Sequence, residues 1–260
     1  MAHNKFYKKT MREQPLDNIV YGRNSVLELL KAGKRTVNKI IVAQTARGGA
    51  VNEIIDLART KGIAVHNVPP EKLDKYSENS QGIAAEVSPI QYFEIEDLIA
   101  LAKKGTNSPL LVLLDGIEDP HNLGAIIRNC VAFGAGGVII PKWRAAGVTE
   151  TVSKSSAGAI EHIAIARVTN TNQTIDLLKK HGFWVAGAEN GGQILEDAKL
   201  PFPLALVIGS EGFGLHNLTK KNCDFLISIP QTNTISSLNA SCASAVILYE
   251  ITKRQFKINK

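Results

Sequence analysis

A continuous apolar run at residues 110–114 (LLVLL) constrains the fold more than any other feature of this sequence. A strand with one face in water alternates apolar and polar residues, whereas a strand buried on both faces is apolar throughout. Comparable short runs follow at residues 137–140 (GVII), 204–208 (LALVI) and 225–229 (FLISI). We therefore expect an α/β fold built on a parallel sheet.

Helical spacing of apolar residues separates these runs, and we expect helices at residues 125–133, 174–180 and 236–249. A further strand is expected at residues 183–186. A strand, a helix and a strand joined by short turns form a βαβ unit, whose crossover should be right-handed.

A smaller α/β pattern precedes the apolar run. It predicts strands at residues 39–43, 63–68 and 82–87 and helices at residues 25–31 and 51–61. We therefore divide the chain into a tail at 1–17, a small domain at 18–88, a linker at 89–108 with a charged helix at 95–104, and a second domain at 109–260.

The chain is basic, with a formal net charge of +6 over 260 residues, which favours an anionic partner, nucleic acid first. Residues 1–17 are polar and basic, and we expect a flexible tail. A second basic stretch has no acid within it and contains Lys31, Lys34, Arg35, Lys39 and Arg47. Two interpretations stay open for these charges: a solvated surface, or contacts with phosphates.

Several protein classes are disfavoured. The 3 cysteines are widely spaced without a CxxC, and the 6 histidines form no HxxxH pair, so we expect neither a disulfide framework nor a metal site. No apolar stretch approaches the ~18 residues of a membrane span, and the N-terminus lacks the apolar run of a signal peptide. We expect a cytoplasmic protein that binds no membrane.

The first motif, residues 115–129 (DGIEDPHNLGAIIRN), follows a buried strand and leads into a helix. In open α/β sheets, loops at the carboxyl ends of strands hold ligands. We place Asn122 in the turn, Gly124 where the chain enters the helix, and Arg128 one turn into that helix. The helix is otherwise apolar, so Arg128 should point to one defined place; the alternative is an arginine that extends along the surface.

The second motif, residues 209–215 (GSEGFGL), contains three glycines in six residues. Such a segment bends sharply and approaches something closely. It is neither GxGxxG nor a P-loop, because GK[ST] is missing. Glu211 in this bend can orient a partner or accept a proton. The alternative is a solvated glutamate in a glycine-rich turn.

The third motif, residues 229–245 (IPQTNTISSLNASCASA), has no charge and is rich in Ser, Thr and Asn. Ser236 or Ser237 would cap the following helix through its hydroxyl. Small residues let another backbone come close, and they stand at Ala240, Ser241, Ala243, Ser244 and Ala245. The alternative is close helix packing in a core or a subunit interface.

Taken together, the three motifs resemble the SpoU (TrmH-type) branch of the SPOUT RNA methyltransferases. The resemblance is carried by DPHNLGAIIRN with VIIP after it, LALVIGSEGFGL with ISIP after it, and SSLNASCASAVILYE. The N-terminal part, VYGRNSVLELL through QGIAAEV, resembles the L30e-like RNA-binding domain of the ribosomal RNA members. The chain is most similar to members that methylate a guanosine ribose 2′-oxygen in large-subunit ribosomal RNA.

This resemblance implies S-adenosylmethionine as the cofactor, bound in a deep trefoil knot made from the C-terminal part of the chain. It also implies ribosomal RNA as a partner and a homodimer formed across the knot. Gly209, Ile229 and Leu238 match the family positions that contact the cofactor.

The resemblance also assigns the catalytic set, whose members are Asn122, Arg128, Glu211, Ser237 and Asn239. The resemblance implies that Arg128 activates the hydroxyl, but a guanidinium is a poor base. From its chemistry we expect Arg128 to contact the RNA phosphate beside the 2′-hydroxyl and steer the proton to that phosphate or to water. Glu211 is expected to fix Arg128 or Asn122. Ser237 and Asn239 are expected to orient the hydroxyl, and no metal is required because a methyl sulfonium is already electrophilic.

Two other functions stay open. The first is the same chemistry on transfer RNA, which is disfavoured because the transfer-RNA members usually lack the L30e-like domain. The second is a catalytically silent RNA-binding protein on the same fold. The intact catalytic set argues against it.

Overall fold

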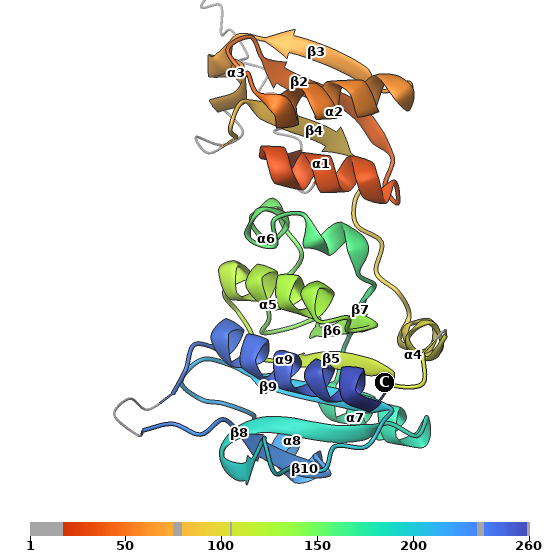
Figure 1. The fold of residues 1–260 in the computed structure, drawn as a ribbon, viewed down its shortest axis with the longest axis vertical. Helices are drawn as coiled ribbons and strands as arrows, with labels where there is room; N and C mark the ends of the chain where they lie inside the picture. Colours follow the sequence, from red (N-terminus) through yellow and green to blue (C-terminus); the bar gives the residue numbers. More distant parts are fainter. Residues whose placement is uncertain (1–17, 75–79, 105, 233–236, 259–260) are drawn as a thin grey trace, which may run out of the picture.

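The computed structural model describes residues 18–74, 80–104, 106–232 and 237–258. The expected flexible tail at residues 1–17 and the candidate cap Ser236 lie outside the described residues. Two sheets follow one another along the longest axis of the molecule, the N-terminal one above the C-terminal one in Figure 1.

The N-terminal sheet has four strands in the order β1-β4-β2-β3. Its strands are β1 Ile19–Tyr21, β2 Val37–Ala43, β3 Ala64–Val68 and β4 Ile83–Val87. β4 pairs antiparallel with both β1 and β2, while β2 and β3 are parallel. Helices α1 (Arg23–Ala32) and α2 (Gly49–Thr60) place their apolar faces in the core of this domain. A short helix, α3 (Pro70–Asp74), follows β3.

The C-terminal sheet has six strands in the order β10-β8-β9-β5-β6-β7. The strands are β5 Leu110–Asp115, β6 Gly137–Pro141, β7 Ile165–Val168, β8 Trp184–Ile194, β9 Leu204–Gly209 and β10 Phe225–Ser228. Every neighbouring pair is parallel. The predicted parallel sheet is therefore confirmed. The runs at 110–114 and 204–208 are the central strands β5 and β9, which are buried at every residue, whereas the run at 225–229 is the edge strand β10.

Helices cover both faces of this sheet. Alternate residues of β5 point to opposite sides: Leu110 and Val112 join the core with α5 (Pro120–Ala132) and α9 (Ala240–Ile258), as Figure 1 shows. Leu111 and Leu113 join the core with α4 (Ile95–Lys103) and α7 (Thr171–Lys180). The segment expected to be a linker thus contains a helix packed on the second sheet.

Three shorter elements complete the second domain: α6 (Glu150–Ser155), the 3-10 helix η2 (Ala159–His162) and α8 (Asn217–Asn222). α6 and η2 form the surface on which the N-terminal domain sits, because α1 packs against η2 and β1 against α6. Figure 1 shows α1 above α6. A buried ion pair joins the two domains, since Arg35 Nη1 lies 3.0 Å from Glu161 Oε1. Across the same junction, His162 Nε2 lies 2.7 Å from Glu28 Oε2.

Among the expected helices, α5 and α9 begin furthest from their expected starts. α5 starts at Pro120, five residues before the expected start, because Asp119 caps it by accepting a hydrogen bond from the His121 backbone N–H at 3.0 Å. Proline at the first helical position is favoured, since its missing N–H would have no partner there. α9 starts later than expected, at Ala240, and continues to Ile258. The trefoil knot implied by the resemblance stays a prediction.

Candidate functional site

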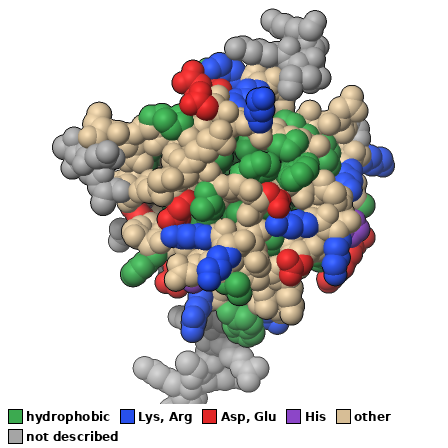
Figure 2. Space-filling view, turned by 90° about the horizontal axis from the view of Figure 1, so that it is seen from below, with side chains coloured by type: hydrophobic (Ala, Val, Ile, Leu, Met, Phe, Trp, Pro, Cys, Tyr) green, Lys and Arg blue, Asp and Glu red, His purple; other side chains and the backbone are tan. Residues whose placement is uncertain are grey.

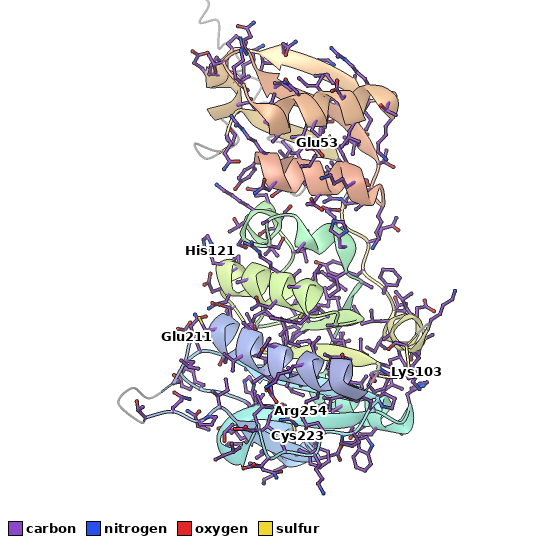
Figure 3. All side chains as sticks on the ribbon, viewed as in Figure 1. Glu53, Lys103, His121, Glu211, Cys223 and Arg254 are labelled. Atoms are coloured by element: carbon purple, nitrogen blue, oxygen red, sulfur yellow. The ribbon has the colours of Figure 1, made fainter. Side chains whose placement is uncertain are left out.

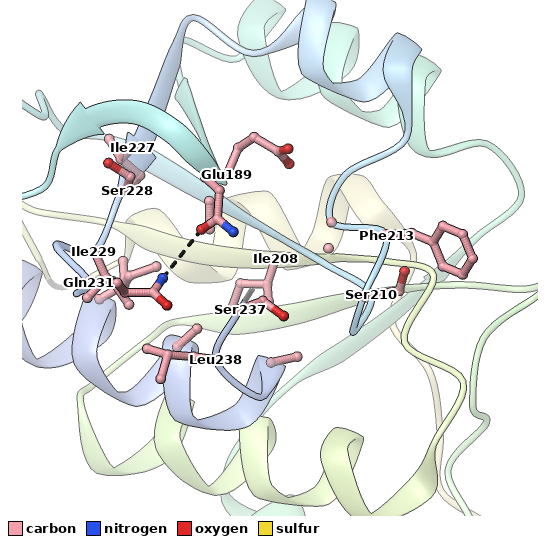
Figure 4. A pocket seen from close by; sticks show the side chains of 18 residues that line it. Glu189, Ile208, Ser210, Phe213, Ile227, Ser228, Ile229, Gln231, Ser237 and Leu238 are labelled. Carbon is pink, nitrogen blue, oxygen red and sulfur yellow. Dashed lines mark hydrogen bonds between the residues drawn. The ribbon is translucent and has the colours of Figure 1, made fainter. Parts of the chain in front are cut away.

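A cavity opens where β9 and β10 end, against the middle of β8 and beside the start of α9 (Figure 4). We call it the glycine-loop cavity. Four of the predicted residues line it together: Gly209, Ile229, Ser237 and Leu238. Its walls are mixed, because apolar side chains from β9, β10 and α9 face polar groups such as Gln231, whose Nε2 donates to Asn190 Oδ1 at 3.4 Å.

The glycine bend closes tightly on itself. The Ser210 N–H donates to the Gly214 carbonyl at 3.1 Å, and the Gly214 N–H donates to the Ser210 carbonyl at 3.0 Å. A Cβ atom on Gly209 would lie 2.2 Å from the carbonyl carbon of Gly214. Gly214 itself has φ of +67°, a conformation that L side chains rarely adopt. The sequence therefore needs glycine at these positions for the loop to form the cavity wall.

Three polar side chains from the three motifs meet beside this cavity. Asn122 Nδ2 donates to Glu211 Oε2 at 3.1 Å. Asn239 Nδ2 donates to Asn122 Oδ1 at 2.9 Å and to Glu211 Oε2 at 3.3 Å. Of the two partners expected for Glu211, the structure gives it Asn122. Figure 3 labels Glu211 near the beginning of α9, on the same side of the molecule as His121 at the beginning of α5.

Asn239 also caps α9. Its Oδ1 accepts from the Ser241 N–H at 2.9 Å and from the Cys242 N–H at 3.3 Å. Ser237, the candidate cap that the structure describes, is therefore not the cap, and that prediction was wrong. Asparagine caps as well as serine because its side-chain oxygen reaches the same free N–H groups. One side chain thus fixes both the start of α9 and the polar cluster.

The small residues of α9 allow close packing on α5, as the alternative interpretation proposed. Asn129 Nδ2 donates to the Ser241 carbonyl and to Ser244 Oγ, both at 2.9 Å. Gly124 has a comparable role on the other side of α5, because a Cβ there would lie 1.9 Å from Ser155 Oγ. Our placement of Gly124 at the helix entrance and of Asn122 in the turn was wrong, since both lie within α5.

Arg128 is not drawn into this cluster. It lies more than two turns into α5, not one, and its side chain is exposed. Within the described residues its guanidinium makes no hydrogen bond or ion pair, and it lines neither the glycine-loop cavity nor the hollow next to it. Its place at the reacting atoms remains a prediction.

A second hollow lies on the other side of the glycine bend, and we call it the outer hollow. Asn122 and Glu211 line it, together with residues that the sequence analysis did not single out: Arg144, Phe213 and His216. Phe213 is 91% exposed and borders both the outer hollow and the glycine-loop cavity, at whose edge it is drawn in Figure 4. His216 is held by Asp115, the last residue of β5. Residues at the carboxyl end of a parallel strand often lie at ligand sites, so the position of Asp115 could have indicated a functional residue.

Glu189, in β8, was also missed. Its Oε2 accepts from the Leu215 N–H at 3.2 Å, and its Oε1 lies 2.5 Å from Lys220 Nζ. It lines the glycine-loop cavity and holds the end of the glycine bend.

Other chemistries receive little support from the described residues. Burial raises the pKa of the Cys130 thiol, and it raises the pKa of Cys223 to about 12, so both stay protonated near neutral pH. No group of three or more His, Cys, Asp or Glu side chains in the described ranges is placed to hold a metal ion. Likewise, no described helix has the length and apolar character needed to cross a membrane.

Sequence profiles of two protein families match the chain. The SpoU rRNA Methylase family matches residues 109–249. A domain described as RNA 2′-O ribose methyltransferase substrate binding matches residues 19–93. Proteins named TrmH family tRNA/rRNA methyltransferase are similar over most of their length. The one from Staphylococcus haemolyticus is 42% identical over 93% of this chain and 98% of its own, and YacO from Bacillus subtilis is 42% identical over 91% and 95%.

Solved structures show the same fold. The SpoU methyltransferase AviRb from Streptomyces viridochromogenes, in complex with AdoMet, superposes with a TM-score of 0.76 at 24% identity, over 92% of this chain and 90% of its own. An RNA methyltransferase of the TrmH family from Porphyromonas gingivalis gives a TM-score of 0.71 at 25% identity, over 91% and 89%.

Proposed function

Since this chain belongs to the SpoU family of RNA methyltransferases, we propose that it methylates a ribose 2′-hydroxyl of a guanosine in large-subunit ribosomal RNA. One observation carries the proposal. The three motifs meet at one place, where Asn122, Glu211 and Asn239 form a polar cluster beside the glycine-loop cavity.

The glycine-loop cavity is proposed as the site of S-adenosylmethionine. Its chemistry fits an adenosine: Ile229 and Leu238 offer apolar walls, and the bend after Gly209 brings backbone groups to the cavity surface without a side chain between. AviRb, which has the same fold, was solved with AdoMet. When bound, this cofactor supplies an electrophilic methyl group.

The catalytic residues have separate proposed roles. Asn122, Glu211 and Asn239 hold one another, so each amide and carboxylate oxygen has a fixed direction before RNA arrives, which favours a productive approach of the hydroxyl. Ser237, in the cavity wall, orients the ribose. Arg128, exposed and without a protein partner in the described chain, is available to bind the phosphate beside the reacting ribose.

The N-terminal domain is proposed to dock the RNA, as its match to a substrate-binding domain supports. At the opposite end of the molecule, Figure 2 shows Lys and Arg side chains interspersed with acidic ones, so that face offers no continuous basic surface. Transfer RNA is the alternative substrate, since the relatives are named for both RNAs.

The proposal also includes a homodimer and a trefoil knot around the cofactor. Light scattering in solution tests the dimer.

Mapping of 2′-O-methyl sites tests the proposal directly. RNA from cells that lack the protein should lose one methylated guanosine in large-subunit ribosomal RNA, and the purified protein with S-adenosylmethionine should restore it. Loss of a transfer-RNA site instead would establish the alternative substrate. If no site is lost and calorimetry detects no S-adenosylmethionine binding, the chain is a non-catalytic RNA-binding protein.

A further inference from the structure

A histidine and a carboxylate form a pair at the outer hollow, from segments 101 residues apart in the chain. His216 Nδ1 lies 3.0 Å from Asp115 Oδ1, and the His216 backbone N–H donates to Asp115 Oδ2 at 2.9 Å. The Asp115 side chain is only 5% exposed, whereas the His216 side chain is 62% exposed. A buried carboxylate therefore holds an imidazole that is itself open to a ligand.

This pairing selects one form of the imidazole. An ionised carboxylate only accepts hydrogen bonds, so Nδ1 of neutral His216 carries the hydrogen and Nε2 carries the lone pair. Within the described residues Nε2 makes no hydrogen bond. A ring oriented by a carboxylate, with its other nitrogen free, is the arrangement that a general base requires.

The surroundings of His216 join it to the proposed site. Asn122 and Glu211, two members of the polar cluster, line the same hollow. The other ionisable groups that line it are Glu118, Asp119 and Arg144, and Lys220, one turn further along α8, is paired with Glu189. The lining of the hollow therefore holds more carboxylates than cations.

We propose that His216 is the general base that accepts the proton of the ribose 2′-hydroxyl, and that Asp115 is its positioning residue. This assignment rests on the proposed function. The ribose oxygen forms a bond to the methyl carbon, the carbon–sulfur bond breaks with its electron pair kept by sulfur, and the proton passes to His216 Nε2 and then to water. It gives the reaction an acceptor that the guanidinium of Arg128 cannot provide.

The tautomer of His216 can be measured without cofactor or RNA. Two-bond proton–nitrogen NMR of the free protein should show His216 with a protonated Nδ1 and an unprotonated Nε2 near neutral pH. Asp115→Asn should change this pattern, and a melting curve checks that this buried substitution leaves the protein folded. A neutral His216 protonated on Nε2 in the wild type would overturn the assignment.

Single-turnover methylation with labelled S-adenosylmethionine and ribosomal RNA from cells lacking the protein is the second test. A general base must be unprotonated to accept a proton, so the wild-type rate should fall as the pH is lowered. His216→Gln should lose roughly 10²–10⁴-fold in rate and also lose this pH dependence, while calorimetry shows unchanged cofactor binding. The matched control is His181→Ala, which removes an exposed histidine whose described hydrogen bonds use its backbone N–H and carbonyl and not its imidazole.

The outcomes separate the two proposals. If the wild type methylates RNA and His216→Gln keeps either its rate or its pH dependence, the assignment of His216 is overturned while the proposed function stands. If the wild type binds S-adenosylmethionine but transfers no methyl group to any RNA, the proposed function and this assignment both fail.

Discussion

Arg35 Nη1 lies 3.0 Å from Glu161 Oε1, and both side chains are buried, at 8% and 2% exposure, where the two domains meet. The same guanidinium donates from Nε to the Ser88 carbonyl at 2.8 Å. Removal of one partner of a buried ion pair leaves an uncompensated charge and typically costs about 3–5 kcal/mol. We expect Arg35→Ala to lower the free energy of unfolding by this amount in urea titration. Lys31→Ala, which removes an exposed pair with Glu53, should cost less than about 1 kcal/mol.

The pH dependence of stability should carry a signature of Glu161. Burial raises the pKa of this carboxyl above its ordinary 4.5, and the charge of Arg35 opposes that rise. A raised folded-state pKa means that the stabilising contribution is fully present below pH 4.5 and is lost as pH rises through the folded pKa. The free energy of unfolding of the wild type should therefore fall relative to Glu161→Gln as pH increases from 4.5. A constant difference, or one that grows with pH, would contradict this prediction.

Asn239 has two functions that substitutions can separate. Asn239→Ala removes the helix cap and should cost about 1 kcal/mol of stability. Asn239→Asp keeps the capping oxygen, and its charge is favourable at a helix N-terminus, but it cannot donate to Asn122 and it places a negative charge beside Glu211. We expect the aspartate variant to melt close to the wild type while both variants lose methyl transfer. Full activity in Asn239→Asp would show that the polar cluster is not needed for the reaction.

The order of helices and strands could be predicted from the sequence, because each central strand produces a recognisable pattern within a few consecutive residues. The run at β5 is apolar at every position, and only burial on both faces accounts for that pattern. The first residues of helices were predicted less accurately, because several neighbouring residues can each serve as the cap. The choice of Asp119 before Pro120, and of Asn239 over the serines near it, depends on the hydrogen bonds of a few atoms.

The composition of the site could be predicted only in part. Gly209 at the end of β9, Ile229 just after β10 and Leu238 just before α9 line one cavity, which agrees with the grouping that the family resemblance implied. The pairing of Asp115 with His216 was not predictable from local pattern, because it requires β5 and the loop before α8 to be brought together by the sheet. Long-range contacts of this kind depend on packing, and no short segment encodes them.

Gly209→Ala should test the glycine-loop cavity. The new Cβ would lie 2.2 Å from the Gly214 carbonyl carbon, so the backbone of the bend must shift. Overpacking of this kind costs about 1–3 kcal/mol. If the cofactor can bind only after the bend regains its shape, the same free energy is lost from binding, which corresponds to roughly 5- to 150-fold weaker affinity. Calorimetry with S-adenosylmethionine should show this weakening. Gly147→Ala, where an added Cβ meets nothing within 4 Å, is the matched control and should bind normally.

Arg128→Ala should separate methyl transfer from cofactor binding. The guanidinium does not line the glycine-loop cavity, so the affinity for S-adenosylmethionine should stay close to that of the wild type. Loss of a phosphate contact that positions the ribose should slow single-turnover methylation by about 10²-fold or more. Arg128→Lys keeps the positive charge but cannot make a bidentate contact with a phosphate. Its methylation rate should therefore lie between those of the wild type and Arg128→Ala. Lys180→Ala removes another exposed positive charge, on α7 of the second domain, and controls for net charge. Near-normal turnover in Arg128→Ala would mean that the exposed side chain on α5 is an ordinary surface arginine and that the phosphate is held by another residue.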